Sequence, residues 1–213
     1  MITTAALSRL AASGDTDAAF RLGYRLAFCR ATESRNPKGA VRQWLAAARA
    51  GHIRAKFYLG TAYDFGHGVG KSPRLAMRWY AAAAKGGHSE AQYNLALGFR
   101  DGIGVSRDLR KAARWLRAAA EQGNSDAQSD LGYCFHEGIG ARRDLKTAAR
   151  WYSKAVELGS LALSLILVFA SATVKVFAGV RFKRVDGLSA QLSAGTQAHD
   201  VFFAAGRITR KLN

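Results

Sequence analysis

Residues 87–122 read GHSEAQYNLALGFRDGIGVSRDLRKAARWLRAAAEQ, and residues 123–158 read GNSDAQSDLGYCFHEGIGARRDLKTAARWYSKAVEL. The two stretches align without a gap, and residues 51–86 align with both of them. The repeat is marked by tryptophans spaced 36 residues apart, namely Trp79, Trp115 and Trp151. A fixed period of this length predicts a stack of small units, in which each unit buries its apolar face against the next.

Each unit is predicted to hold two helices joined by a glycine turn. In the stretch quoted first, Ala91, Leu95 and Phe99 follow at four-residue steps, which is the spacing of one helix face. We expect Ser89 to cap this first helix and Ser125 to cap the equivalent helix of the next unit. A Gly-x-Gly turn follows each first helix, at residues 66–68, 102–104 and 138–140. Glycine allows the positive φ with which a chain leaves one helix and turns back.

The second helix of each unit is predicted to begin at a capping residue. These residues are Ser72, Asp108 and Asp144. The buried stripe of the middle unit contains alanines together with Trp115 and Leu116. Small side chains allow helices to approach closely, and we expect the large aromatic side chains to fill the gap between adjacent units.

A worn copy of the unit precedes the three regular ones, at residues 14–50. Its connecting loop is one residue longer and lacks the double glycine. We expect residues 1–13 to hold a helix that covers the open end of the stack. The predicted organisation is therefore a capping helix at 1–13, a repeat solenoid at 14–158 and a divergent segment at 159–213. The solenoid divides into residues 14–50, 51–86, 87–122 and 123–158.

The shared positions resemble the Sel1-like repeat family, whose pattern is A-x-x-x-L-G, then G-x-G, then D-x-x-x-A-x-x-W-Y. In the last regular unit these positions are Ala127, Leu131, Gly132, Gly138, Gly140, Asp144, Ala148, Trp151 and Tyr152. The resemblance covers residues 14–158 and implies an all-α fold, a right-handed α/α superhelical solenoid similar to a tetratricopeptide array. It also implies an adaptor that holds other proteins, often in bacterial signalling, envelope or host-interaction pathways.

The chain is strongly basic, with 32 Lys and Arg against 15 Asp and Glu and a net charge of +17. Such a charge attracts nucleic acid, anionic lipid or acidic protein surfaces. The second helices are especially basic, through Arg110, Lys111, Arg114, Arg117, Arg142, Arg143, Lys146, Arg150 and Lys154. One interpretation is an outer ridge that binds nucleic acid or acidic lipid. We favour a solvated face, because the charge is spread along the chain and no aromatic residues alternate with it on an exposed face.

The repeat signature fails after residue 158. Residues 161–174 form an uncharged apolar run, followed by Lys175 and by basic residues at 181–184. Three interpretations are open, namely a helix that caps the solenoid, a membrane anchor through 161–180, and an altered reading frame. Lys175 counts against a spanning helix, because a central charge costs roughly 2.5–3.5 kcal/mol on insertion scales. We expect the capping helix, and a short further helix near 198–211.

No constellation of residues predicts catalysis, a metal site or a cofactor. His136 and Glu137 begin like a zinc motif, but Gly140 stands where the second histidine is needed. His52 and His88 share one repeat position, which favours a structural role. Cys29 and Cys134 are the only cysteines, and both are expected to pack as small apolar residues in a reducing compartment.

Exposed binding positions should vary between copies, whereas core positions are shared. On the first helices, which should line the concave surface, three columns vary: Tyr58, Asn94 and Asp130; Arg54, Glu90 and Asp126; and Thr61, Leu97 and Tyr133. The predicted function is a non-enzymatic, monomeric, cytoplasmic adaptor that binds a protein or peptide through this surface. The alternative is a protein that binds nucleic acid or a membrane surface through its basic outer face and tail.

Overall fold

The computed structural model describes residues 3–28 and 35–157, and these residues contain nine α-helices and no strand. The helices are α1 (Thr4–Ala12), α2 (Thr16–Phe28), α3 (Pro37–Arg49), α4 (Ile53–Phe65), α5 (Pro73–Lys85), α6 (Ser89–Asp101), α7 (Leu109–Glu121), α8 (Ser125–Glu137) and α9 (Leu145–Glu157). The predicted all-α class is confirmed. Residues 159–213, including the hydrophobic run 161–180 and the helix expected near 198–211, lie outside the described residues.

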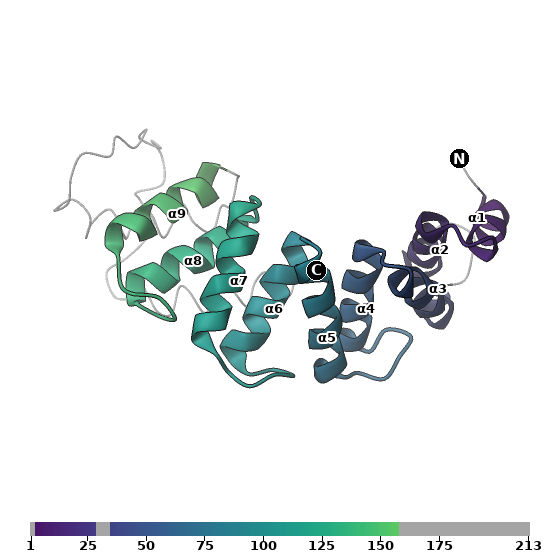
Figure 1. Ribbon diagram of the computed structural model, residues 1–213, viewed down its shortest axis with the longest axis horizontal. Coiled ribbons are helices and arrows are strands. Elements are labelled where there is room, and N and C mark those ends of the chain that lie inside the picture. The colour runs from purple at the N-terminus through teal and green to yellow at the C-terminus, as the bar shows by residue number, and fades with distance from the viewer. Residues whose placement is uncertain (1–2, 29–34, 158–213) are drawn as a thin grey trace, which may run out of the picture.

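The helices after α1 form four antiparallel pairs that follow one another along a curved array (Figure 1). We call the pairs unit 1 (α2, α3), unit 2 (α4, α5), unit 3 (α6, α7) and unit 4 (α8, α9). Within each unit the two helices pack extensively, and the second helix also packs on the first helix of the next unit. Because the array is curved, both of its ends lie toward the top of Figure 1. This is the predicted helical solenoid, and α1 packs against α2 at its beginning.

Capping side chains begin the helices, but not all of them are the predicted ones. The side chains of Ser72 and Asp108 accept hydrogen bonds from backbone N–H groups of α5 and α7, as expected. In α6 the cap is His88, whose Nδ1 accepts from the backbone N–H of Ala91, and not Ser89. In α8 the cap is likewise Asn124 instead of Ser125. The predicted caps Ser89 and Ser125 were wrong, and each lies one residue after the true cap. The side chain of the preceding residue already accepts from the free N–H groups of the helix.

The second glycine of each Gly-x-Gly turn joins one unit to the preceding one. Gly104 has φ +72° and lies against the backbone carbonyl of Pro73 at the start of α5, with no room for a β-carbon. Gly68 and Gly140 make the same contact with Pro37 and Leu109. We call this contact the glycine joint. It places the backbone of one unit directly on the second helix of the unit before it.

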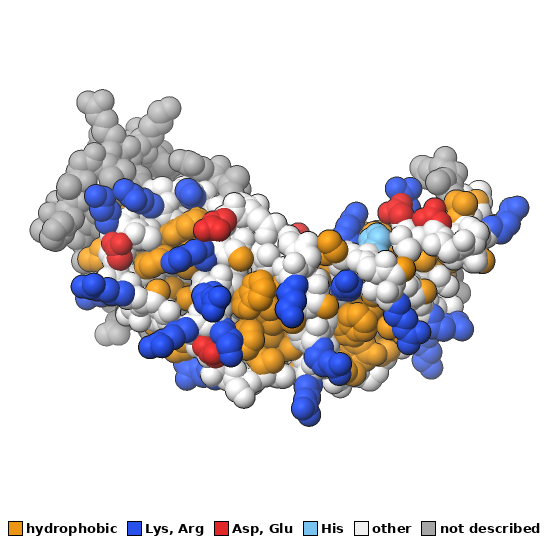
Figure 2. Space-filling model, viewed as in Figure 1, with side chains coloured by type: hydrophobic (Ala, Val, Ile, Leu, Met, Phe, Trp, Pro, Cys, Tyr) orange, Lys and Arg blue, Asp and Glu red, His pale blue; other side chains and the backbone are white. Residues whose placement is uncertain are grey.

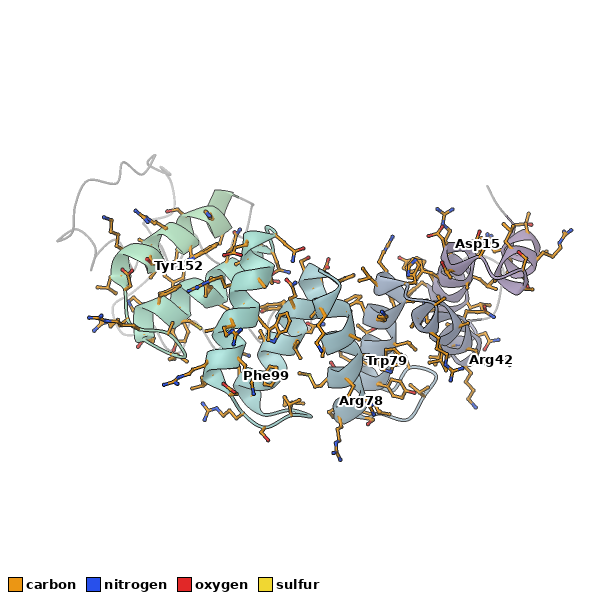
Figure 3. The ribbon with its side chains drawn as sticks, in the orientation of Figure 1. Asp15, Arg42, Arg78, Trp79, Phe99 and Tyr152 are labelled. Carbon is orange, nitrogen blue, oxygen red and sulfur yellow. The ribbon has the colours of Figure 1, made fainter. Side chains whose placement is uncertain are left out.

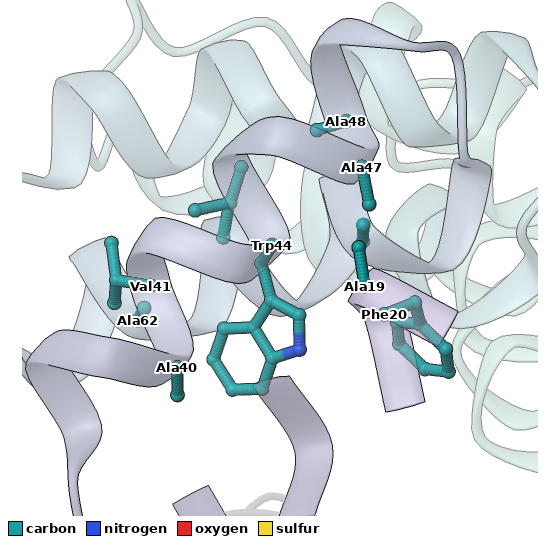
Figure 4. Packing of buried hydrophobic residues seen from close by; sticks show 10 residues of the cluster. Ala19, Phe20, Ala40, Val41, Trp44, Ala47, Ala48 and Ala62 are labelled. Carbon is teal, nitrogen blue, oxygen red and sulfur yellow. The ribbon is translucent and has the colours of Figure 1, made fainter. Parts of the chain in front are cut away.

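Tight packing at one repeated position forms the core of the array. Tyr80, Leu116 and Tyr152 occupy this position on α5, α7 and α9, and each is at most 3% exposed. In unit 1 the same position holds Trp44, which is 3% exposed and packs among alanines of α2, α3 and α4 (Figure 4). Each of these buried side chains fills a space between packed helices that would otherwise be a void.

The three aligned tryptophans are less buried than the sequence predicted. Trp115 is half-buried and contacts the core clusters on both sides of it, so its predicted bridging role between units is confirmed. Trp79 and Trp151 are half-buried as well. The tryptophans therefore belong to the predicted buried stripe only in part, because the residue that follows each of them, Tyr80, Leu116 or Tyr152, occupies the core position.

Candidate protein-binding site

The nine residues predicted for binding all lie on the first helices α4, α6 and α8, but in different surroundings. Arg54, Glu90 and Asp126 are exposed. The others are half-buried, namely Tyr58, Thr61, Asn94, Leu97, Asp130 and Tyr133. Several of them have partners within the protein: the Thr61 hydroxyl donates to the Tyr58 carbonyl, and Asn94 lies beside the Tyr80 hydroxyl. The columns therefore vary partly because each unit gives them a different neighbour.

Tyr58 lies at the centre of a group of aromatic rings contributed by units 1 and 2. Its ring centroid is 5.6 Å from that of Phe20, 5.7 Å from Tyr24, 6.1 Å from Phe28 and 5.2 Å from Trp44. Tyr24 and Phe28 keep 45% and 48% of their surface exposed. We call Tyr24, Phe28 and Tyr58 the aromatic patch. Burial, together with the neighbouring Tyr24, raises the pKa of Tyr58 above its usual value.

A cation borders the aromatic patch. The Arg54 guanidinium lies 4.8 Å above the centre of the Phe20 ring, while its own side chain remains exposed. Below the patch, Phe20 stacks on the imidazole of His52 at 4.6 Å. Arg54 and Tyr58 were predicted from the sequence, whereas Tyr24 and Phe28 were not. The available signal was the concentration of aromatic residues in 20–28, which lies in the worn copy of the repeat.

Asp130 occupies the column of Tyr58 but serves as a link between units 3 and 4. Its carboxylate accepts hydrogen bonds from the Tyr93 hydroxyl at 3.4 Å and from the Arg100 guanidinium at 3.2 Å. The Asp130 side chain is 20% exposed, and its burial raises the pKa of the carboxyl to about 6. Arg100 also donates to Asp101 at 2.8 Å. These groups neutralise one another, so Asp130 is poorly placed to meet a partner directly.

The first and second helices of the units differ in net charge. The second helices α3, α5, α7 and α9 carry 13 Lys and Arg against 2 Asp and Glu. The first helices α2, α4, α6 and α8 carry 5 against 7. We call the surfaces that they form the second-helix face and the first-helix face. The positive charge is thus spread along the chain, as the sequence indicated, but it is concentrated on one face in space.

Charge also changes along the first-helix face. Its first two helices, α2 and α4, carry 4 Lys and Arg against 2 Asp and Glu, and they hold the aromatic patch. Its last two helices, α6 and α8, carry 1 against 5. This face therefore has an aromatic, slightly basic half and an acidic half.

The described residues contain no group of three or more His, Cys, Asp or Glu side chains arranged to hold a metal ion. His136 and Glu137 form an exposed pair at 2.7 Å. Cys134 is free and buried, as predicted, and its burial raises the pKa of the thiol to about 11. Cys29 and His199 lie outside the described residues.

Among the described residues, no helix is both long enough and apolar enough to cross a membrane. The possible anchor at 161–180 falls beyond that part.

The solenoid resembles solved structures of repeat proteins from bacteria. One is c5321, a protective antigen present in uropathogenic Escherichia coli strains, at 34% identity and a TM-score of 0.78. The match covers 81% of this chain, which spans only 37% of the length of c5321. A Sel1 repeat protein from Oxalobacter formigenes matches at 27% identity and a TM-score of 0.71, over 79% of this chain and 69% of that one.

A more distant structure shares the fold alone. Cysteine rich protein B of Helicobacter pylori matches at 21% identity and a TM-score of 0.51, over 62% of this chain and 98% of the other. A search of curated protein sequences found no significant match.

The family model of the Sel1 repeat matches the chain four times in succession. The matched residues are 16–52, 53–88, 89–124 and 125–160, so the worn first copy is included. Sel1 repeat proteins generally mediate protein–protein interaction and generally act as non-catalytic scaffolds. With four consecutive repeats that cover most of its length, the chain belongs to the Sel1 repeat family.

Proposed function

We propose that this protein is a non-enzymatic adaptor that binds another protein or a peptide through the first-helix face, with the aromatic patch as the anchor. The observation that carries the proposal is the exposure of Tyr24 and Phe28 around the half-buried ring of Tyr58. Aromatic side chains dominate the binding energy of protein interfaces, since they bury a large area with few rotatable bonds. A rigid helical array holds these rings in place before a partner arrives.

The charge gradient of this face indicates how a partner would lie on it. An apolar or aromatic side chain of the partner would cover the aromatic patch, beside Arg54. The rest of the partner would run toward α6 and α8, where Asp126 is exposed and acidic residues predominate. Basic residues of the partner would complement this end. The expected ligand is therefore a segment with an apolar anchor at one end and basic residues at the other.

The setting that we propose is a bacterial signalling or envelope pathway. The family generally binds proteins, and c5321, to which the solenoid is similar, is described as a protective antigen. This chain spans 37% of the length of c5321, so its partner is to be identified with this chain itself.

The test is to capture partners from a bacterial lysate at high salt with the full chain and with two variants. The first variant replaces the exposed rings of the patch, Tyr24→Ser with Phe28→Ser. The matched control is Phe65→Ser, which removes a ring that is 66% exposed at the position of unit 2 equivalent to Phe28. Circular dichroism establishes that each variant keeps its helices.

We expect one or a few proteins to bind the native chain and the Phe65 variant, and to be lost from the Tyr24/Phe28 variant. Basic segments should predominate in the bound regions of those proteins. If the patch variant retained every partner at native levels, the anchor would lie elsewhere and this site assignment would be wrong.

A further inference from the structure

A shallow groove of about 470 Å³ lies on the second-helix face between α5 and α7. Leu95 and Phe99 of α6 and Trp115 of α7 form the apolar part of its lining, which we call the apolar floor. Arg74, Arg78 and Lys85 of α5 line it as well, together with Met77, Ala81, Gly104 and Val105. Among the described residues that line the groove, none is acidic. Figure 2 shows hydrophobic side chains in the middle of the array with Lys and Arg around them.

Two of the three basic residues at this groove, Arg74 and Arg78, belong to columns that run the length of the array. The first column is Lys38, Arg74, Arg110 and Lys146, and the second is Arg42, Arg78, Arg114 and Arg150, each with the 36-residue spacing. All eight side chains are exposed, and none forms a salt bridge with another described residue. Arg78 extends away from α5 in Figure 3. Eight exposed cations in register present a positive surface that is complementary to an acidic partner.

The shape of the groove argues for an acidic peptide over a nucleic acid. Stacking of bases needs a free ring face. Here Lys111 Nζ lies 5.5 Å from the centre of the Phe99 ring, and in the next unit Lys154 Nζ lies 4.5 Å from Trp151. Phosphates alone would engage the cations and leave the apolar floor empty.

A membrane surface fits less well for the opposite reason. Proteins that lie on a membrane insert apolar side chains beyond the level of their cations. Here the apolar atoms lie in a recess, and the exposed Arg74, Arg78 and Lys85 stand around it. The structure also corrects the interpretation that no aromatic residues accompany the basic face, because Phe99 and Trp115 lie between its cations.

We propose that this groove is a second docking site, which binds an acidic peptide segment of another protein. One apolar side chain of the segment occupies the recess over Phe99 and Trp115. Carboxylates on either side of that side chain pair with Arg74, Arg78 and Lys85, and further carboxylates follow the two basic columns. The site is independent of the aromatic patch, which lies on the other face.

The test measures binding of a short fluorescein-labelled peptide in which leucine alternates with pairs of glutamate. Fluorescence anisotropy with the full chain gives the dissociation constant. We expect the double variant Arg74→Glu with Arg78→Glu to weaken binding about tenfold or more. Ala81→Gln, which fills the groove without a change of charge, should weaken it as well. The matched control for charge is Arg9→Glu with Lys56→Glu, on α1 and α4, and should leave binding near the native level.

Two further ligands decide the class of partner. A peptide with serine in place of leucine should bind about tenfold more weakly than the leucine peptide, because it leaves the recess empty. Equal affinity for both peptides, or native affinity of the Arg74/Arg78 variant, would overturn the proposal. Tighter binding of single-stranded oligonucleotide or of phosphatidylglycerol vesicles, lost in the Arg74/Arg78 variant, would overturn it in favour of nucleic acid or membrane.

Discussion

The Arg100 guanidinium of α6 donates a hydrogen bond to the Asp130 carboxylate of α8 at 3.2 Å, so a charged contact joins units 3 and 4. Burial is the largest influence on this carboxyl and raises its pKa from 3.8 to about 6, although Arg100 and Tyr93 act in the opposite direction. The folded protein therefore holds the Asp130 proton more tightly than the unfolded chain does. As a result, the contribution of Asp130 to the free energy of unfolding falls as pH rises from about 4 to about 6.

Asp130→Asn should remove this pH dependence. We expect the free energy of unfolding of the variant, relative to the native protein, to increase between about pH 4 and pH 6 and to stay level above that range. Chemical denaturation at a series of pH values measures the difference. Tyr93→Phe provides the second readout: it removes a hydrogen bond that lowers the pKa of Asp130, so the carboxyl resonance should titrate at a higher pH than in the native protein. Titration near pH 4 in the native protein would contradict the burial described here.

Gly104→Ala should destabilise the array strongly. The residue has φ +72°, and a β-carbon would overlap the carbonyl of Pro73 in the preceding unit. The matched control is Gly87→Ala, since Gly87 has φ +90° but nothing within 4 Å of the added carbon. The control should lose about 1–2 kcal/mol from backbone strain alone. Gly104→Ala should lose about 1–3 kcal/mol more, because overlap with backbone forces the units apart. Equal losses in thermal or denaturant unfolding would show that the glycine joint is looser than the structure indicates.

Trp44→Ala should cost more stability than Trp115→Ala, although the substitution is chemically the same. Trp44 is 3% exposed, so the loss should fall in the range of about 3–5 kcal/mol for a buried tryptophan. Trp115 is half-buried at the edge of two clusters, so its loss should fall below that range. Denaturation in urea with tryptophan-independent detection compares the two. The reverse order would mean that the aligned tryptophans, and not the residues that follow them, anchor the core.

His88→Asn should reduce the sensitivity of α6 to mild acid. Burial is the largest cause that lowers the pKa of His88 from 6.5. The neutral Nδ1 accepts from the Ala91 N–H at 3.4 Å, and a protonated Nδ1 would instead donate to Glu90 at 3.0 Å. Stability from this group is therefore complete above pH 6.5 and is lost as pH falls below it. Asparagine caps the equivalent helix of unit 4 and does not titrate. If the native protein and the variant lost stability in parallel below pH 6.5, the cap would not depend on the protonation of His88.

The repeat itself allowed the fold to be predicted from the sequence. Three copies without gaps show which positions are always small, always apolar or always glycine, and a helix pair follows from that pattern. The contact that Gly104 makes with Pro73 was not predictable, because the sequence shows why a turn needs glycine but not what lies opposite it. The histidine caps were missed because histidine is unusual at that position, although His52 and His88 recur there.

The candidate site was predicted less completely. Variation between copies was taken as a sign of exposure, but Asp130 differs from Tyr58 because it faces Arg100 instead of a group of aromatic rings. Two buried glutamines, Gln92 and Gln128, were overlooked for a related reason. The side-chain amide of each donates a hydrogen bond to a backbone carbonyl at the end of the preceding second helix, that of Ala84 or Ala120. A glutamine in the sequence does not show that its hydrogen-bond partner is a backbone group.

The alternation of first and second helices has a consequence for how such a protein changes over generations. The two faces are interleaved along the gene, yet the aromatic patch lies on α2 and α4 whereas the two basic columns lie on α3, α5, α7 and α9. A point mutation in α5 or α7 can retune the basic surface while Tyr24, Phe28 and Tyr58 stay as they are. Duplication of one complete 36-residue unit, in contrast, lengthens both surfaces together and brings its own glycine joint with it. Substitution and duplication thus offer two separate routes to a new pair of partners.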